Sequence, residues 1–236
     1  MDLIITGQSK GLGRAIYTLA LDVQSISGIL TIGRDAVVPL PGNVHVQADL
    51  ADRKQLDAVC TEVEAWILSQ QNEPGELIFI NNAASIYPID RIGGMSTFDV
   101  CDHITVNAIA PVVLTNALLK ARKKRPGLQV VIINLTSAAA NRAIEGWSLY
   151  SSSKLLAKHF FEVIKVENDA ENIKIIQFDP GKMDTDMQAY IREQDPSIFP
   201  DVDIFKDAAT LGRLASPELV AKNLLDLAFS EVLSSN

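Results

Sequence analysis

Three residues, Ser137, Tyr150 and Lys154, carry side chains that could together perform acid–base chemistry. Tyr150 and Lys154 are four residues apart in a helical pattern, so both side chains would lie on one face of a helix. An ammonium beside a phenol favours the phenolate, and we expect it to lower the Tyr150 pKa from about 10 toward neutrality, as a general acid or base requires. Ser137 follows an apolar strand, at the sheet edge where open α/β folds bind ligands. Because Tyr-x-x-x-Lys is common by chance, the pair indicates a catalytic site only in combination with other motifs.

A glycine-rich turn, Thr6–Gly13, lies directly after the first apolar run and before the first helical pattern. Glycine permits a positive φ and close backbone approach, and the free N–H groups of a helix N-terminus attract phosphate. The spacing matches neither the common dinucleotide fingerprint nor a Walker loop. A purely structural turn is the alternative, but the position after the first strand favours a nucleotide site.

The residues about twenty positions beyond the glycines indicate which nucleotide is bound, because NAD sites place an acid there and NADP sites an arginine nearby. In this chain Gly33 is followed by Arg34 and then Asp35, and Lys10 adds a second cation within the turn. Two cations near one ribose suit a 2′-phosphate, while Asp35 can point to solvent. An ordinary surface role for Arg34 is the alternative.

Asn107 lies in a helical stretch four residues before Pro111. Because proline has no N–H, the carbonyl of Asn107 loses its usual helical partner, and a freed carbonyl at a kink can hold a water. A helix that is merely kinked is the alternative interpretation.

Short β-type runs alternate with longer helical patterns, which predicts a three-layer, Rossmann-type, doubly wound parallel α/β sheet. Few residues separate the second and third strands, so a helix between them would be very short or absent. The predicted strands are Leu3–Thr6, Gly28–Gly33, Asn43–Gln47, Leu77–Ile80, Leu128–Leu135 and Ile173–Phe178, and the predicted helices are Gly11–Gln24, Ala51–Gln70, Thr97–Arg122 with an interruption at Pro111, Trp147–Ala170, and a last one from an N-cap at Ser216 to about Phe229.

The composition is that of an ordinary globular protein. The 236 residues contain no repeat or linker, so we expect one domain over residues 1–236. With 29 acidic against 21 basic residues and a net charge of −8, the chain is a poor candidate for binding nucleic acid. The basic run Lys120–Arg125 fits a solvated helix end, where cations oppose the helix dipole.

Cysteines and histidines indicate neither a disulfide framework nor a metal site. Cys60 and Cys101 are the only cysteines, and His45, His103 and His159 lack metal-ligand spacing. No apolar run approaches the length of a membrane span, and the N-terminus does not resemble a signal peptide. We therefore expect a cytoplasmic protein that binds no metal and no membrane.

In their order along the chain, the motifs resemble those of the short-chain dehydrogenase/reductase family over nearly the full length. Each motif is weak alone, whereas the ordered set is specific. The matching features are T-G-x-x-x-G-x-G at Thr6–Gly13, an acid at Asp49, N-N-A at Asn81–Ala83, Asn107, Ser137 thirteen residues before Tyr150, Lys154, and P-G-x-x-x-T at Pro180–Thr185.

The resemblance implies a role for each matching residue. Tyr150 would protonate the carbonyl oxygen during reduction, Ser137 would hold that oxygen, and Lys154 would hydrogen-bond the nicotinamide ribose. Asn107 would anchor a water of a proton relay. The implied cofactor-binding residues are Thr6, Gly7, Ser9, Lys10, Gly11, Leu12, Gly13, Arg34, Asp49, Leu50, Asn82, Ala83, Tyr150, Lys154, Pro180, Gly181, Met183 and Thr185.

Within the family, Thr6–Gly13, Asp184–Gln188 and Leu214–Glu218 look like the benzil reductase and sepiapterin reductase branch. This resemblance implies NADPH as cofactor and a ketone or a bulky, often aromatic, dicarbonyl as substrate. It also implies a homodimer, which in relatives is paired through the two long helices. A catalytically silent NADPH-sensing protein and an NAD-linked alcohol dehydrogenase are the alternatives.

Aromatic and thioether side chains flank the catalytic stretches and could form the substrate pocket, with core packing as the alternative. We expect a substrate lid at roughly 184–214. Two departures from the family pattern are Ala84, where N-N-A-G is usual, and a C-terminal stretch without the usual final strand. The sequence therefore predicts six strands, with a seventh absent or vestigial. The candidate pocket residues are Tyr87, Trp147, Met187 and Tyr190.

Overall fold

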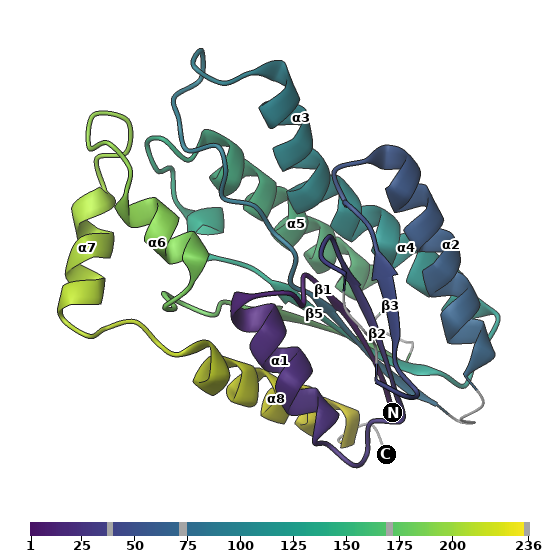
Figure 1. The fold of residues 1–236 in the computed structure, drawn as a ribbon. Helices are drawn as coiled ribbons and strands as arrows, with labels where there is room; N and C mark the ends of the chain where they lie inside the picture. The colour runs from purple at the N-terminus through teal and green to yellow at the C-terminus, as the bar shows by residue number, and fades with distance from the viewer. Residues whose placement is uncertain (37–39, 71–74, 169–171, 234–236) are drawn as a thin grey trace.

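The computed structural model describes residues 1–36, 40–70, 75–168 and 172–233 (Figure 1). Six parallel strands form one sheet in the order β3-β2-β1-β4-β5-β6, with helices on both faces. This confirms the predicted doubly wound α/β fold. The strands are β1 (Asp2–Thr6), β2 (Gly28–Gly33), β3 (Val44–Gln47), β4 (Glu76–Asn81), β5 (Gln129–Leu135) and β6 (Ile173–Phe178).

The predicted helices begin and end close to their expected positions, whereas the helices at Asp186–Arg192 and Val202–Thr210 (α6 and α7) were not predicted. Among the described residues no helix lies between β2 and β3, as the short connection indicated. The helical elements are α1 (Gly11–Leu21), α2 (Arg53–Ser69), α3 (Thr97–Ile104), the π turn η1 (Thr105–Ile109), α4 (Ala110–Lys123), the 3-10 turn η2 (Ala138–Asn141), α5 (Ser148–Glu167), α6 (Asp186–Arg192), α7 (Val202–Thr210) and α8 (Pro217–Leu233).

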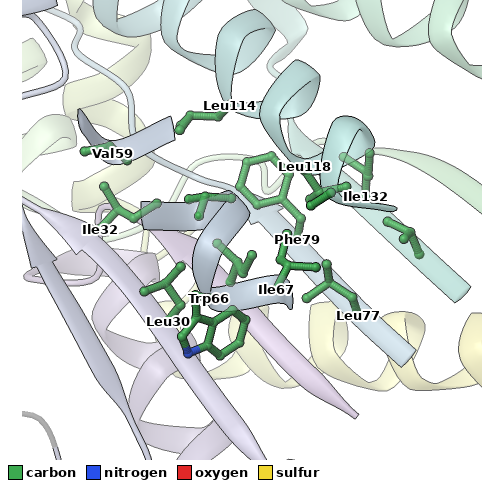
Figure 2. Close-up of a cluster of buried hydrophobic side chains, with 14 of the residues drawn as sticks. Leu30, Ile32, Val59, Trp66, Ile67, Leu77, Phe79, Leu114, Leu118 and Ile132 are labelled. Carbon is green, nitrogen blue, oxygen red and sulfur yellow. The ribbon is translucent and has the colours of Figure 1, made fainter. Parts of the chain in front are cut away.

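Strand residues alternate between two apolar cores, one on each face of the sheet. Ile4 and Phe79 pack with α2 and α4, whereas their neighbours Leu3 and Ile78 pack with α1 and α8. Figure 2 shows part of the first core, in which Trp66 of α2 lies over the strands. Each large apolar side chain buried in this way contributes roughly 1.5–3 kcal/mol. The two cores fix the sheet edge from which the loops after β1, β4 and β5 project.

The long helical stretch after β4 departs from the prediction. The interruption is a π turn at Thr105–Ile109, and Pro111 follows it in the first turn of α4. Proline is tolerated there because the first N–H groups of a helix have no intrahelical partner. The proline therefore starts a new helix, and the irregular turn lies just before it, around Asn107.

The same stretch, Thr97–Lys123, is long and apolar enough by composition to cross a membrane, although it contains no uninterrupted apolar run of that length. Half of its most apolar window is buried inside the fold. Leu114 and Leu118 belong to the core beneath α2 (Figure 2). These are the features of a core helix of a soluble protein.

Segment 184–214 stands apart from the sheet and contains α6 and α7 (Figure 1). A parallel bridge between Met183 and Ala215 closes its base, where Asp184 N donates to Ala215 O at 3.0 Å. Beyond it, α8 continues to Leu233, past the predicted end near Phe229. The described residues after β6 form no seventh strand.

Candidate active site

A cavity of about 710 Å³ opens at the carboxyl ends of β1, β4 and β5, where the strand order reverses. Such a switch point is the usual ligand site of open α/β sheets. Most of the predicted site residues line it. They are Gly7, Ser9, Lys10, Gly11, Leu12, Gly13, Arg34, Asp49, Leu50, Asn82, Ala83, Tyr87, Tyr150, Lys154, Pro180, Met183, Thr185, Met187 and Tyr190.

Five of the predicted site residues are not among those that line the cavity. Thr6 and Asn82 hold the glycine turn: Thr6 Oγ1 accepts from Asn82 N at 3.0 Å, and Asn82 Nδ2 donates to Gly7 O at 3.0 Å. Asn82 itself reaches the cavity, but Thr6 acts behind it. The residues away from the lining are Thr6, Asn107, Ser137, Trp147 and Gly181.

The glycine turn has the geometry of a phosphate cradle. Gly7 has a φ of +73°, and a side chain on Gly13 would put its Cβ 2.0 Å from Gly7 O. Only glycine fits at both positions. Lys10 is the N-cap of α1 and its side chain makes no capping hydrogen bond, so no side chain caps the N–H groups of the first turn. The turn therefore fits the pyrophosphate of a dinucleotide.

Two cations, Lys10 and Arg34, line the cavity. Arg34 lines it and Asp35, the acid that would favour NAD, does not. The Gln47 side chain donates to Arg34 O at 3.0 Å, and His45 Nε2 lies 2.9 Å from Asp35 O. The backbone that carries Arg34 is thus fixed from β3.

The second cation, Lys10, forms an ion pair with Asp186 of α6 at 3.5 Å. Both side chains are largely exposed. Because exposed ion pairs contribute only about 0.2–1 kcal/mol, a bound phosphate can compete for this lysine.

Helix α5 places Tyr150 and Lys154 side by side in the cavity wall. Both residues are buried, and Lys154 Nζ donates to Leu135 O at 2.7 Å. Ser137 caps η2 by accepting from Ala139 N and also hydrogen-bonds Tyr150, which lowers the phenol pKa. The three residues that the sequence singled out are therefore brought together.

The prediction that Lys154 lowers the pKa of Tyr150 toward neutrality is wrong. Burial raises the pKa of Tyr150 to about 12 and lowers that of Lys154 to about 8. Burial dominates because the charged form of each group loses its contact with water. In addition, Lys154 Nζ donates to the carbonyl of Leu135 and lies 5.9 Å from the centre of the Tyr150 ring. The carboxylate of Asp179 raises the Tyr150 pKa further, whereas at Lys154 it opposes the lowering of the pKa by burial. At neutral pH the site therefore holds a neutral phenol and a charged lysine.

Asn107 lies in the π turn, and both ends of its side-chain amide are hydrogen-bonded. Oδ1 accepts from Ser85 N, and Nδ2 donates to Ser85 O, both at 2.7 Å. Its backbone carbonyl has no i+4 donor, because that position is Pro111. The carbonyl, not the amide, is the group of Asn107 that could hold a water.

The predicted substrate residues Tyr87, Met187 and Tyr190 lie together in the cavity wall. The rings of Tyr87 and Tyr190 lie 6.2 Å apart, and Met187 lies beside them in the lining. The alternative reading, core packing, is correct for Trp147, which stacks on Phe199 at 4.9 Å between ring centres. Trp147 also meets Tyr150 edge-on at 5.3 Å, so it supports the tyrosine from behind.

Sequence reasoning missed a set of lining residues from the segment after β4 and from the helix that follows it. Their signal was available, because Phe98, Asp102 and Val106 are spaced four residues apart, as on one face of a helix. Ala84, the departure from the family pattern, also lines the cavity. The missed residues are Ile86, Phe98, Asp99, Asp102, His103 and Val106.

In the described part of the chain, no group of three or more histidine, cysteine or carboxylate side chains is placed so that it could hold a metal ion. Cys60 and Cys101 are both free thiols.

Comparison with known proteins gives consistent results. Residues 2–196 match the family model described as short chain dehydrogenase. A benzil reductase ((S)-benzoin forming) of Bacillus subtilis is 34% identical over 226 residues, covering 95% of this chain and 91% of that protein. A sepiapterin reductase of Xenopus tropicalis is 29% identical over 246 residues, covering 98% and 92%.

Solved structures show the same fold. The KRED1-Pglu enzyme superposes with a TM-score of 0.80 at 23% identity, covering 97% of this chain and 94% of that one. The closed form of a serine dehydrogenase complexed with NADP+ gives a TM-score of 0.71 at 19% identity, covering 97% and 89%.

Proposed function

The chain belongs to the short-chain dehydrogenase family, and on that premise we propose that it is an NADPH-dependent reductase that transfers a hydride to a ketone or dicarbonyl. The observation that carries the proposal is the buried Tyr150, which lines the cavity, is hydrogen-bonded by Ser137 and lies beside Lys154. The relatives named benzil reductase and sepiapterin reductase support carbonyl reduction.

The proton chemistry follows from the two buried groups. When bound, the reduced nicotinamide supplies the hydride. Tyr150, with a pKa of about 12, keeps its proton at neutral pH and donates it to the carbonyl oxygen that Ser137 helps to orient. Lys154, still charged below its pKa of about 8, holds the ribose and offsets the negative charge left on the phenol. Asn107 anchors, through its carbonyl, a water that returns a proton.

The cofactor is proposed to be NADPH because Lys10 and Arg34 stand where a 2′-phosphate would lie. Charge-assisted hydrogen bonds to phosphate are worth roughly 1.5–3 kcal/mol each, enough to select NADPH over NADH. Asp49, Leu50, Thr185 and Met183 all line the cavity, the first two proposed to contact the adenine and the last two the carboxamide.

The substrate is proposed to be a flat, bulky or aromatic carbonyl compound. Tyr87, Tyr190 and Met187 give that end of the cavity an apolar wall, and such walls take aromatic ligands by stacking and by thioether contacts. Segment 184–214, which contributes the last two residues, acts as the substrate lid.

The protein is further proposed to be a single-domain, cytoplasmic homodimer. Helix α5 exposes an apolar surface that a second copy would cover. The large exposed apolar residues on this helix and on the neighbouring π turn are Ile109, Leu155, Leu156, Val163 and Val166.

The proposal is tested by following NADPH absorbance with a panel of dicarbonyls, pterins, quinones and simple ketones. We expect NADPH oxidation with at least one bulky carbonyl, and its loss in Tyr150→Phe with NADPH binding retained. Binding without turnover on the whole panel would identify a silent NADPH-binding protein. Preferential oxidation of alcohols with NAD+ would identify a dehydrogenase working in the other direction.

A further inference from the structure

His103 is a buried histidine whose ring is fixed at both nitrogens. It is 1% exposed, in the last turn of α3. Its Nδ1 lies 2.8 Å from the carbonyl oxygen of Tyr87, and its Nε2 lies 2.9 Å from Asn107 Nδ2. A carbonyl oxygen only accepts hydrogen bonds, so Nδ1 must carry the proton.

The second nitrogen faces an amide of known orientation. The amide of Asn107 is oriented by the backbone of Ser85, whose N–H bonds Oδ1 and whose carbonyl bonds Nδ2. Because this pairing excludes a flipped amide, the Asn107 group that faces Nε2 of His103 is an NH2 donor. Nε2 accepts from Asn107 in the neutral Nδ1–H form of the ring, whereas the backbone of Leu149 favours the protonated ring.

The ring joins three parts of the active site. Tyr87 belongs to the substrate wall, and Asn107 to the π turn. On the other side, the hydroxyl of Ser153 lies 3.2 Å from Nε2 and donates to the backbone carbonyl of Tyr150 at 3.1 Å. The tyrosine ring itself meets the imidazole edge-on at 6.4 Å.

We propose that His103 is a positioning residue of the reductase, which in its neutral form holds the Tyr87 wall and the Tyr150 helix in register around the carbonyl substrate. This inference rests on the proposed carbonyl reduction. The ring works through Tyr87, Asn107 and Ser153 and takes no part in the proton transfer.

Protonation would disrupt this arrangement. A proton on Nε2 would put a donor against the NH2 group of Asn107 and break that contact. Burial, the largest effect, lowers the His103 pKa below its usual 6.5, and the charge of Lys154 on α5 lowers it further, whereas backbone hydrogen bonds with Tyr87 and Leu149 raise it. The other titratable groups nearby are Tyr150 on α5 and Asp99 and Asp102 on the ring's own helix. The His103 ring therefore stays neutral at neutral pH and becomes protonated only when the pH falls below its lowered pKa.

Two substitutions separate positioning from folding. His103→Phe keeps an aromatic ring but removes both hydrogen bonds, and His103→Gln can keep one of them. We expect kcat/KM for the carbonyl to fall by about tenfold to a hundredfold in His103→Phe, and less in His103→Gln, because rates respond steeply to misplaced groups. NADPH affinity should stay close to that of the unsubstituted enzyme, and the acid limb of the pH profile should disappear in both variants.

The matched control is His159→Gln, since His159 is an exposed histidine on α5. It should retain the activity and the acid limb. If both His103 variants keep the kcat/KM and the acid limb of the unsubstituted enzyme, the inference is overturned while the proposed function stands.

A second measurement does not depend on turnover. The 15N shifts of the His103 ring should report the neutral Nδ1–H tautomer at pH 7, with protonation below the usual pKa. In His103→Gln, the backbone amide signals of Ser85, Tyr87 and Asn107 should shift while those of the glycine turn do not. An Nε2–H tautomer, a pKa at or above 6.5, or unshifted amides would overturn the inference even if no carbonyl substrate were found.

Discussion

Lys154 Nζ donates a hydrogen bond to the carbonyl oxygen of Leu135, 2.7 Å away at the end of β5. Leu135 is two residues before Ser137, so this bond ties helix α5 to the strand that leads to Ser137, the serine proposed to act in catalysis. It also keeps the ammonium in a buried position, and burial is what lowers its pKa to about 8.

The first prediction concerns alkaline pH. Lys154 is charged below about pH 8, and its charge is needed to hold the cofactor ribose in the proposed mechanism. The kcat/KM for NADPH should therefore fall by about tenfold per pH unit above pH 8, because this ratio reports groups of the free enzyme. Tyr150, with a pKa of about 12, does not titrate in that range. A profile that stays level to pH 10 would contradict the assignment to Lys154.

The second prediction concerns stability. The Lys154 pKa is lower in the folded protein than the usual 10.5, so folding is disfavoured while the lysine is charged, and stability from this group rises between about pH 8 and 10.5. Lys154→Met should leave the melting temperature at pH 7 unchanged or higher, since removing the charge offsets the lost bond to Leu135. NADPH binding should weaken in the same variant. A large loss of stability would contradict this account.

The third prediction concerns cofactor choice. Lys10→Ala with Arg34→Ala should raise the KM for NADPH by about a hundredfold or more, since each charge-assisted bond is worth roughly 1.5–3 kcal/mol, and should affect NADH far less. Equal effects on the two cofactors would disprove the 2′-phosphate assignment.

The fourth prediction concerns the support of Arg34 from β3. His45→Ala and Gln47→Ala release the carbonyls of Asp35 and Arg34, so both should raise the KM for NADPH while leaving that for NADH nearly unchanged. The measurement is the ratio of kcat/KM for the two cofactors. An unchanged ratio would show that the arginine needs no such support.

The fifth prediction concerns the lid. Gly146 has a φ of +81°, and a Cβ there would lie 2.7 Å from Ile198 O in the lid. Phe199, the next residue, stacks on Trp147 beneath Tyr150. Gly146→Ala should therefore displace the lid and raise the KM for the carbonyl substrate.

Gly42→Ala is the matched control for that substitution. Gly42 lies between β2 and β3, outside segment 184–214, and has a φ of +87° but nothing within 4 Å of its Cβ position. It should lose about 1–3 kcal/mol of stability from backbone strain alone, with the substrate KM unchanged. Equal KM values in both variants would contradict the proposed docking of the lid at Gly146.

The sequence predicted the sheet and most of the cavity because those features depend on local patterns. Alternation of strands and helices is visible residue by residue, and Tyr150, Lys154 and the glycine turn depend on short spacings. Properties that depend on tertiary packing could not be predicted from the sequence in the same way. The Tyr150 pKa is an example, since its cause is burial by distant groups such as Trp147, which itself stacks on Phe199 of the lid.

His103 illustrates the same limit. In the sequence it was notable only for lacking the spacing of a metal ligand. Its partners Tyr87 and Ser153 are 16 and 50 residues away in the chain, so no local pattern could connect them. The π turn around Asn107 likewise had only Pro111 as a signal, and that signal predicted the interruption a few residues late.

The bridge between Met183 and Ala215 brings the two ends of segment 184–214 together, so the segment leaves and rejoins the rest of the chain at one point. A stretch whose two ends are already paired can be lengthened, shortened or exchanged without moving the strands that bear the chemistry. Grafting the corresponding segment of a relative at these two residues is therefore a route to altered substrate range. Evolution can use the same junction. Segment 184–214 can change, and with it the range of substrates, while the residues proposed for hydride transfer stay the same.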